Sequence, residues 1–157
     1  MPNWTYSYTP AIEARAAKAM AWDIPLHPKV MTEVARTLKG MRLLEAEEYL
    51  RRVIDLKEPV PFRSANKKVP HKRGLADRWG WPVGKYPVKA AKYMLKVLEN
   101  AANNAENKNL DIERLYIAHI GVHKGITLKR VYPRAFGRAD IIRRVRSHVE
   151  VIVEERG

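Results

Sequence analysis

The segment Gly121–Arg146, GVHKGITLKRVYPRAFGRADIIRRVR, carries eight Lys or Arg against a single acidic residue. Glycines and a proline interrupt this segment, so it cannot form one long helix. The interrupting residues are Gly121, Gly125, Pro133 and Gly137. Two β-rich runs flank it, Leu110–Ile120 on one side and Val145–Val153 on the other. We therefore predict a β-hairpin with strands of about eleven residues, a reach of roughly 35 Å, that carries its cations to a polyanion.

The charge of the whole chain agrees with a polyanionic partner. The 157 residues have a net charge of +13, and such an excess repels itself unless an anion neutralises it. Nucleic acid is the leading candidate, because the planar fork of arginine matches phosphate oxygens. An anionic membrane would require a basic amphipathic helix with Trp or Phe on its apolar face, whereas most cations here lie in broken segments.

The composition excludes several kinds of site. The chain has no Cys, so disulfides, Cys-ligated zinc and thiol nucleophiles are excluded. Its first ten residues lack the basic flank and apolar core of a secretory signal, and it has no window of 18 apolar residues. We expect an intracellular protein whose 157 residues form one domain.

Three helices are predicted from apolar residues spaced three and four apart. They span about Pro28–Lys39, Arg42–Leu56 and Pro87–Glu106. Small residues at the end of the third helix would let another element approach it closely. The segment Ala11–Ile24 is ambiguous, because its alanines favour a helix whereas the period of two in its apolar residues favours a strand.

A second basic segment, Phe62–Tyr86, interleaves aromatic residues with cations and contains one acid, Asp77. We predict an irregular loop, and loops of this length inside a domain are usually functional or disordered. Trp79 and Trp81 could stack on unpaired bases. We expect most of their area to pack onto the helices instead, while the cations of the loop meet phosphate.

Two other clusters give little support for enzyme chemistry. His119 and His123 could bind zinc from a helix, but the β-branched residues around them indicate a strand without a third ligand. We expect solvated or RNA-facing histidines and no metal. Glu45, Glu47 and Glu48 should face outward and pair with basic residues one turn further on. The sequence has no Gly-rich phosphate loop or nucleophile elbow, so we expect neither catalysis nor a cofactor.

Four segments together resemble the universal L-twenty-two family of large-subunit ribosomal proteins, in its archaeal and eukaryotic form. They are HPKVMTEVARTLKG (27–40), LLEAEEYLRRVIDLKEPVPF (43–62), KYPVKAAKYMLKVLENAANNAE (85–106) and ITLKRVYPRAFGRADIIRRVRSHVEVIVEE (126–155). They occur in the family order and cover most of the chain after about Glu13. The loop after Pro61 lies where archaeal and eukaryotic members carry extra residues.

This resemblance implies an α+β fold in which a small antiparallel sheet packs against three helices and a long β-hairpin protrudes. It implies a structural protein, not an enzyme, that binds large-subunit ribosomal RNA, supports its assembly and lines the nascent-peptide exit tunnel with its hairpin tip. The implied partners are ribosomal RNA, neighbouring ribosomal proteins and the nascent polypeptide, in the cytoplasmic large subunit and not at a membrane. The family strand at Ala14–Ala16 favours a strand for Ala11–Ile24.

Within one domain over residues 1–157, we expect a globular part at about 11–109, a loop at about 62–86, and a hairpin at about 110–155 with its tip at about 124–140. The expected RNA-binding residues are Arg15, Arg63, Lys67, Lys68, Lys72, Arg73, Arg78, Lys85, Lys124, Lys129, Arg130, Arg134, Arg138, Arg143, Arg144 and Arg146. The expected tunnel-tip residues are Leu128, Lys129, Arg130, Val131, Tyr132, Pro133 and Arg134. Phe136 stands where a more polar residue is common in the family, and we assign it no RNA contact.

Two other functions remain open from the sequence. A free-standing DNA- or chromatin-binding protein could place the hairpin in a groove, although a single hairpin without a dimer seam is an unusual DNA reader. An RNA-processing enzyme would require a cluster of acids, bases or metal ligands, which the sequence lacks. Equal affinity for duplex DNA and folded RNA would support the first alternative, and nuclease activity with Mg²⁺ the second.

Overall fold

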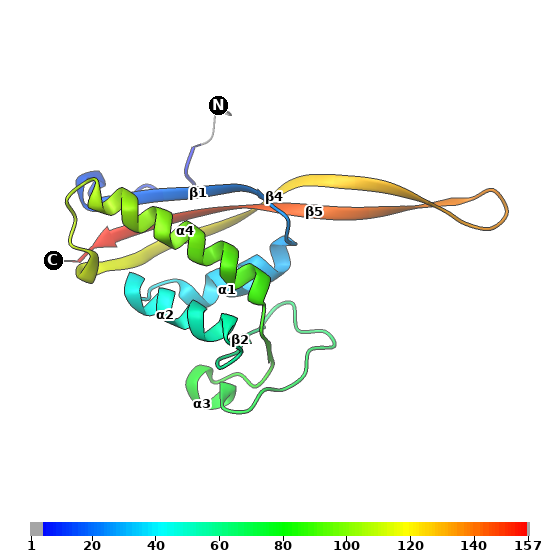
Figure 1. Ribbon diagram of the computed structural model, residues 1–157, viewed down its shortest axis with the longest axis horizontal. Helices are drawn as coiled ribbons and strands as arrows, with labels where there is room; N and C mark the ends of the chain where they lie inside the picture. The colour runs from blue at the N-terminus through cyan, green and yellow to red at the C-terminus, as the bar shows by residue number, and fades with distance from the viewer. Residues whose placement is uncertain (1–4, 157) are drawn as a thin grey trace.

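Residues 5–156 form a three-stranded antiparallel sheet, two strands of which extend into a long hairpin, together with a two-stranded sheet, four α-helices and two short 3-10 helices (Figure 1). The elements in chain order are η1 (Glu13–Arg15), β1 (Ala16–Ile24), α1 (Pro28–Leu38), α2 (Leu43–Ile54), β2 (Val60–Pro61), α3 (Leu75–Trp79), β3 (Gly84–Lys85), α4 (Val88–Glu106), η2 (Ile112–Arg114), β4 (Leu115–Pro133) and β5 (Ala139–Glu155). The structure is a computed structural model that describes residues 5–156, so the ends of the predicted domain, residues 1–4 and 157, lie outside it. The α+β fold predicted for the chain is confirmed.

The sheet has the strand order β1-β5-β4, and α1, α2 and α4 cover one of its faces (Figure 1). Alternate residues of the central strand, Val149, Val151 and Val153, are fully buried in the core beneath these helices. Burying a side chain of this size contributes about 1.5–3 kcal/mol. The helices and the sheet, called the body here, therefore have a core of their own. This core holds the root of the hairpin, which is the part of β4 and β5 that lies within the sheet.

In the ambiguous segment, residues 16–24 form β1, so the pattern of period two prevails there over the helix propensity of alanine. The strand expected at Ala14–Ala16 begins only at Ala16, because Glu13–Arg15 form the short 3-10 helix η1. Ala17 and Ala19 are buried on the face of β1 that lies against α4. Their small side chains allow the close approach predicted for the end of α4, where the Asn104 side-chain amide donates to the Lys18 carbonyl at 2.9 Å. Tertiary packing thus selects the strand.

The predicted helices are confirmed within one or two residues at each end. The first, α1, begins at Pro28, and the preceding His27 ring accepts a hydrogen bond from the Lys29 N–H at 3.2 Å. It ends before Gly40, whose φ of +86° is a left-handed conformation that glycine adopts without strain. Proline at the start and glycine past the end are typical helix boundaries.

The hairpin strands are longer than predicted. Pairing between β4 and β5 extends from Leu115, opposite Glu155, to Pro133, opposite Ala139. The predicted end of the first strand at Ile120 is therefore wrong. Shifts in register interrupt the pairing between residues 117 and 119 and between residues 124 and 127, as β-bulges do, and the second shift contains Gly125. The segment 124–140 contains the paired ends of both strands as well as the turn.

Candidate RNA interface

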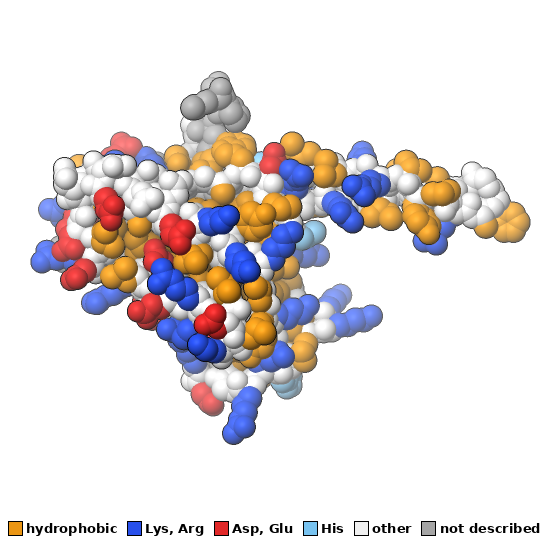
Figure 2. All heavy atoms as spheres, in the orientation of Figure 1, with side chains coloured by type: hydrophobic (Ala, Val, Ile, Leu, Met, Phe, Trp, Pro, Cys, Tyr) orange, Lys and Arg blue, Asp and Glu red, His pale blue; other side chains and the backbone are white. Residues whose placement is uncertain are grey.

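The outer part of the hairpin, about residues 126–144, leaves the rest of the protein and packs against no other element of residues 5–156 (Figure 1). Every residue from Leu128 to Arg144 is exposed. The exposed residues include large apolar side chains, among them Val131 and Ile141, which lie opposite each other. Figure 2 shows these apolar side chains mixed with Lys and Arg along the projection. A surface of this kind suits a partner with both charged and apolar groups, such as RNA.

The strand register places Lys129 directly opposite Arg143. Like charges in this position destabilise a sheet, because the paired side chains lie on the same face about 5 Å apart. Neighbouring residues on a strand point to opposite faces, so Arg130 and Arg144 share the other face. Both faces of the hairpin therefore carry cations, although only Lys129 and Arg143 are directly opposite each other. The repulsion within that pair is relieved when phosphate lies against it.

A turn over residues 135–138 joins the two strands at the end of the hairpin. In this turn the Arg138 backbone N–H donates to the Ala135 carbonyl at 3.3 Å. Phe136 and Gly137 between them have φ of +58° and +66°, the signature of a type I′ turn. This turn prefers Asn before Gly, and a bulky residue with positive φ is strained. The structure thus presents the Phe136 ring, 98% exposed, at the far end of the molecule.

One cation of the tip is neutralised within the protein. The Arg134 guanidinium donates from Nε to the Asp140 carboxylate at 2.7 Å, and it lies 5.2 Å from the centre of the Tyr132 ring. Asp140 is the only acidic residue in this part of the hairpin. Arg134 is therefore held in place by a local ion pair, and its neighbours carry the net positive charge of the tip.

A buried carboxylate fixes the root of the hairpin. Glu150 on β5 is fully buried, and its oxygens accept the Ser7 backbone N–H at 3.2 Å and the Ser7 hydroxyl. Burial alone would raise the pKa of Glu150, but the hydrogen bonds from Ser7 and His123 hold it below its ordinary value. The carboxylate therefore stays charged and ties the N-terminal segment to the outer face of the sheet.

The two histidines contact this carboxylate and are partly exposed. Nε2 of His119 lies 3.4 Å and Nε2 of His123 3.3 Å from the nearest Glu150 oxygen. The His119 ring also stacks on Tyr8, with ring centres 5.3 Å apart. The expectation of solvated histidines holds in part, because the side chains of His119 and His123 are 21% and 38% exposed. Contact of either ring with RNA stays a prediction.

A second buried carboxylate anchors the basic loop. Glu33 on α1 is 1% exposed, and it accepts the backbone N–H groups of Arg63, Ser64 and Ala65 at 3.0, 2.8 and 2.9 Å. Burial acts to raise the pKa of Glu33, but these three donors lower it below the ordinary value. The start of the loop is therefore fixed to α1 by a charge-assisted contact.

The loop contains more structure than the sequence predicts. The two-stranded sheet β2-β3 closes it, and the five-residue helix α3 lies within it. Trp79 packs partly against the core, with its ring edge toward Tyr49, and the Trp81 indole N–H donates to the Phe62 carbonyl at 2.9 Å. The two tryptophans therefore support the loop, as expected for most of their area.

The predicted RNA-binding residues fall into two groups. Eight lie on the hairpin and seven in the loop, whereas Arg15 lies apart in η1. Fourteen of the sixteen are exposed, and Lys72 and Arg146 are half-buried. Arg78 is engaged within the protein, because it forms ion pairs with Glu58 and with Glu45, the latter at 3.8 Å. The contact of each residue with RNA stays a prediction.

Sequence reasoning missed the cations that join these two groups. Lys29, Arg36 and Lys39 are exposed on α1. Arg36 shares a small depression with Arg63 of the loop, and Arg36 and Lys39 line a groove with Val122 of β4. Figure 2 shows Lys and Arg side chains in the angle between the hairpin and the lower part of the body. The spacing of seven and three residues along α1 would have placed them on one face.

Among residues 5–156, no helix is long and apolar enough to cross a membrane. The same part of the chain contains no group of three or more His, Cys, Asp or Glu that could hold a metal ion. The acidic cluster on α2 forms the expected ion pairs, with Glu47 3.4 Å from Arg51 and Glu48 3.6 Å from Arg52. Glu48 is exposed as expected, whereas the Glu47 side chain is only 13% exposed and burial raises its pKa.

Comparison with known proteins identifies the family. The model of the family described as "Ribosomal protein L22p/L17e" matches residues 19–154. The chain is 59% identical to "Large ribosomal subunit protein uL22" of Aeropyrum pernix over 155 residues, and 57% identical to the protein of that name from Ignicoccus hospitalis over 157 residues, each alignment covering 99% of both chains. It is 48% identical to the Methanopyrus kandleri protein of that name over 156 residues, 98% of this chain and 97% of the relative. The chain therefore belongs to the ribosomal protein L22p/L17e family.

Proposed function

We propose that this large-subunit ribosomal protein, which is not an enzyme, binds large-subunit ribosomal RNA through its hairpin, its basic loop and the exposed face of α1. The hairpin and the body meet at an angle (Figure 1), and an RNA helix seated there would contact all three surfaces. Holding separate RNA segments in one orientation would support assembly of the subunit. In the large subunit, neighbouring ribosomal proteins would be further partners of the chain.

The observation that carries this proposal is the pair of cations at Lys129 and Arg143, opposite each other on a hairpin that nothing in residues 5–156 covers. Repulsion between them works against the folded hairpin. Phosphate bound beside this pair would reverse this effect and stabilise the extended conformation. The apolar residues beside them would pack against sugars and bases in the same contact.

The reach of the hairpin supports a role for its tip in the wall of the nascent-peptide exit tunnel. The ten residues from Lys124 to Pro133 extend roughly 33 Å at about 3.3 Å per residue. Their narrow, two-stranded form can pass between packed RNA helices to a site far from the body. There the tip, with Val131, Tyr132 and the residues near them, would face the growing polypeptide.

Binding of the full-length protein to protein-free archaeal large-subunit ribosomal RNA tests the proposed RNA binding. We expect an affinity that falls steeply with salt, as for several phosphate contacts, and a clear preference for this RNA over duplex DNA of equal length. Equal affinity for the DNA would instead support a free-standing DNA-binding protein.

A photo-crosslinking amino acid at the position of Val131 tests the tunnel assignment. Ribosomes that contain this variant and a stalled, labelled nascent chain should give a crosslink between the two. The same amino acid at Glu113, at the opposite end of β4, should give none. A nascent chain that crosslinks to neither position, on subunits that contain the protein, would contradict the assignment.

A further inference from the structure

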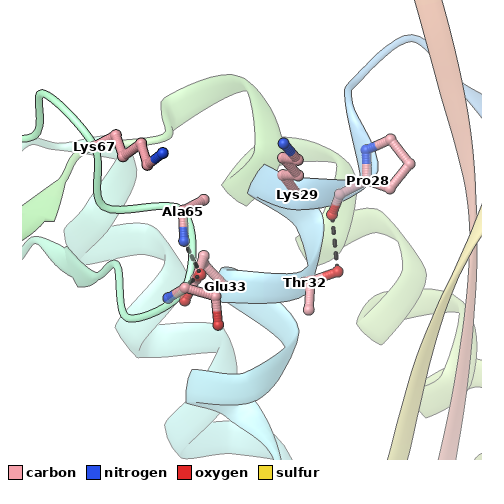
Figure 3. Close-up of a pocket in the computed structure, with 7 residues that line it drawn as sticks. Pro28, Lys29, Thr32, Glu33, Ala65 and Lys67 are labelled. Atoms are coloured by element: carbon pink, nitrogen blue, oxygen red, sulfur yellow. Dashed lines mark hydrogen bonds between the residues drawn. The ribbon is translucent and has the colours of Figure 1, made fainter.

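A hollow of about 540 Å³ opens between the first turns of α1 and the start of the basic loop (Figure 3). Most of its lining is apolar, and Pro28, Thr32 and Ala65 contribute to it. Its volume falls within the range of roughly 300–1,000 Å³ that is typical of small-ligand sites.

The polar groups at the edge of the hollow are engaged with the protein. The Thr32 hydroxyl donates to the Pro28 carbonyl at 2.9 Å, which Figure 3 marks with a dashed line. The Glu33 carboxylate accepts the three N–H groups of the loop described above, so its charge is compensated by the backbone. The hollow therefore offers carbon surface to a ligand, in a fixed shape.

Two lysines flank this surface. Lys29 stands on α1 and Lys67 on the loop, on either side of the hollow in Figure 3. Both side chains are exposed, and neither forms an ion pair within residues 5–156. The site thus combines a mostly apolar lining with two unneutralised ammonium groups. A bare phosphate would not use the apolar lining, and an apolar peptide would leave both charges unpaired.

We propose that this hollow binds a single unpaired nucleotide of the ribosomal RNA. Its base lies against Pro28 and Ala65, and the phosphates on either side of it bind Lys29 and Lys67. The inference rests on the proposed RNA binding and adds a site for one extruded base to it. An unpaired base in such a site can contribute to recognition beyond phosphate neutralisation.

Base-specific chemical probing of the ribosomal RNA, with and without the full-length protein, tests the site. Wild-type protein should protect one unpaired nucleotide. The Ala65→Leu variant fills the hollow but keeps both lysines, so it should restore the reactivity of that nucleotide alone and weaken binding roughly ten-fold. Ala76→Leu, an equal change at an exposed position on α3, should change neither measurement.

The double variant Lys29→Gln/Lys67→Gln provides a test that leaves the apolar lining and the Glu33 anchor unchanged. It should expose the same nucleotide and lower the salt dependence of binding by about two phosphate contacts. Protection that survives both variants would overturn the inference. RNA that does not bind wild-type protein at all would instead refute the proposed function itself.

Free mononucleotides distinguish a site for RNA from a site for a soluble ligand. We expect that none of the four ribonucleoside monophosphates, at millimolar concentration, binds in the hollow of the isolated protein. Binding in the hollow would be recognised by its loss in the Ala65→Leu variant. Binding of that kind would assign the hollow to a free nucleotide and overturn the assignment to RNA.

Discussion

Replacing Lys129 by Glu should strengthen the free hairpin and weaken RNA binding. In the structure Lys129 faces Arg143 across the two strands, on an exposed part of the hairpin. The change converts a like-charge pair into an opposite-charge pair, and cross-strand pairs of this kind differ by about 0.2–1 kcal/mol. Hydrogen exchange of the backbone amides around the pair should therefore slow, by up to roughly five-fold.

The loss of RNA affinity follows from the phosphate contacts. Glu at this position removes one contact and repels the phosphate bound at Arg143, so about two contacts are lost. With a salt exponent of about 0.9 per phosphate, binding at about 0.15 M salt should weaken roughly 30-fold. The uncharged variant Lys129→Gln loses one contact and should weaken binding roughly 5-fold.

Filter binding to large-subunit ribosomal RNA over a range of salt concentrations measures the loss of affinity in Lys129→Glu and in Lys129→Gln. The matched control is Arg114→Glu, which changes the net charge equally at an exposed position at the opposite end of the molecule. An equal loss in this control would mean that only net charge matters. Unchanged affinity in Lys129→Glu would refute the role of the hairpin, and slower exchange together with weaker binding excludes misfolding as the cause.

Three other predictions concern the buried groups. Glu33→Gln should cost about 1–3 kcal/mol in the free energy of unfolding and speed amide exchange at residues 63–65; unchanged exchange there would show that the loop does not depend on this anchor. The pKa values of Glu33 and Glu150 lie below their ordinary value. The stability that these two carboxylates contribute is therefore present above about pH 4.5 and is lost as the pH falls through the lowered values. A melting temperature that falls as steeply on acidification in Glu150→Gln as in wild type would contradict this. Gly121→Ala should destabilise the protein by roughly 1–3 kcal/mol in denaturant unfolding, because its new methyl group would lie 2.8 Å from the Glu150 Cγ; a stable variant would show that the root of the hairpin can adjust.

Much of the body could be predicted from local patterns. The spacing of Val30, Val34 and Leu38, with Pro28 before them and Gly40 after them, places α1 correctly because helix boundaries depend on residues close in sequence. The strand at Ala16–Ile24 was less certain. Its alanines alone favour a helix, and only packing against α4 decides in favour of the strand.

The extent of the hairpin could not be predicted in the same way. Gly121 and Gly125 look like breaks in a strand, but at Gly121 the absence of a side chain makes room for Glu150 on the opposite strand. That requirement depends on a partner far along the chain. Pro133 is tolerated because it is the last residue of its strand.

The two buried carboxylates were not found either. Glu33 binds backbone groups about thirty residues away, and Glu150 binds Ser7 from the other end of the chain. Backbone N–H donors have no sequence signature, so such contacts leave no local pattern. The contact of the two histidines with Glu150 was missed for the same reason, since this carboxylate comes from the opposite strand.

The reactivity of individual lysines toward acetylation, measured on the wild-type protein with and without large-subunit ribosomal RNA, tests the central claim most directly. We predict strong protection of Lys67, Lys124 and Lys129, from the loop and the hairpin, and little change at Lys108, which follows the far end of α4. Protection of Lys108 with unchanged reactivity of Lys124 and Lys129 would place the RNA on the other end of the molecule and contradict the interface.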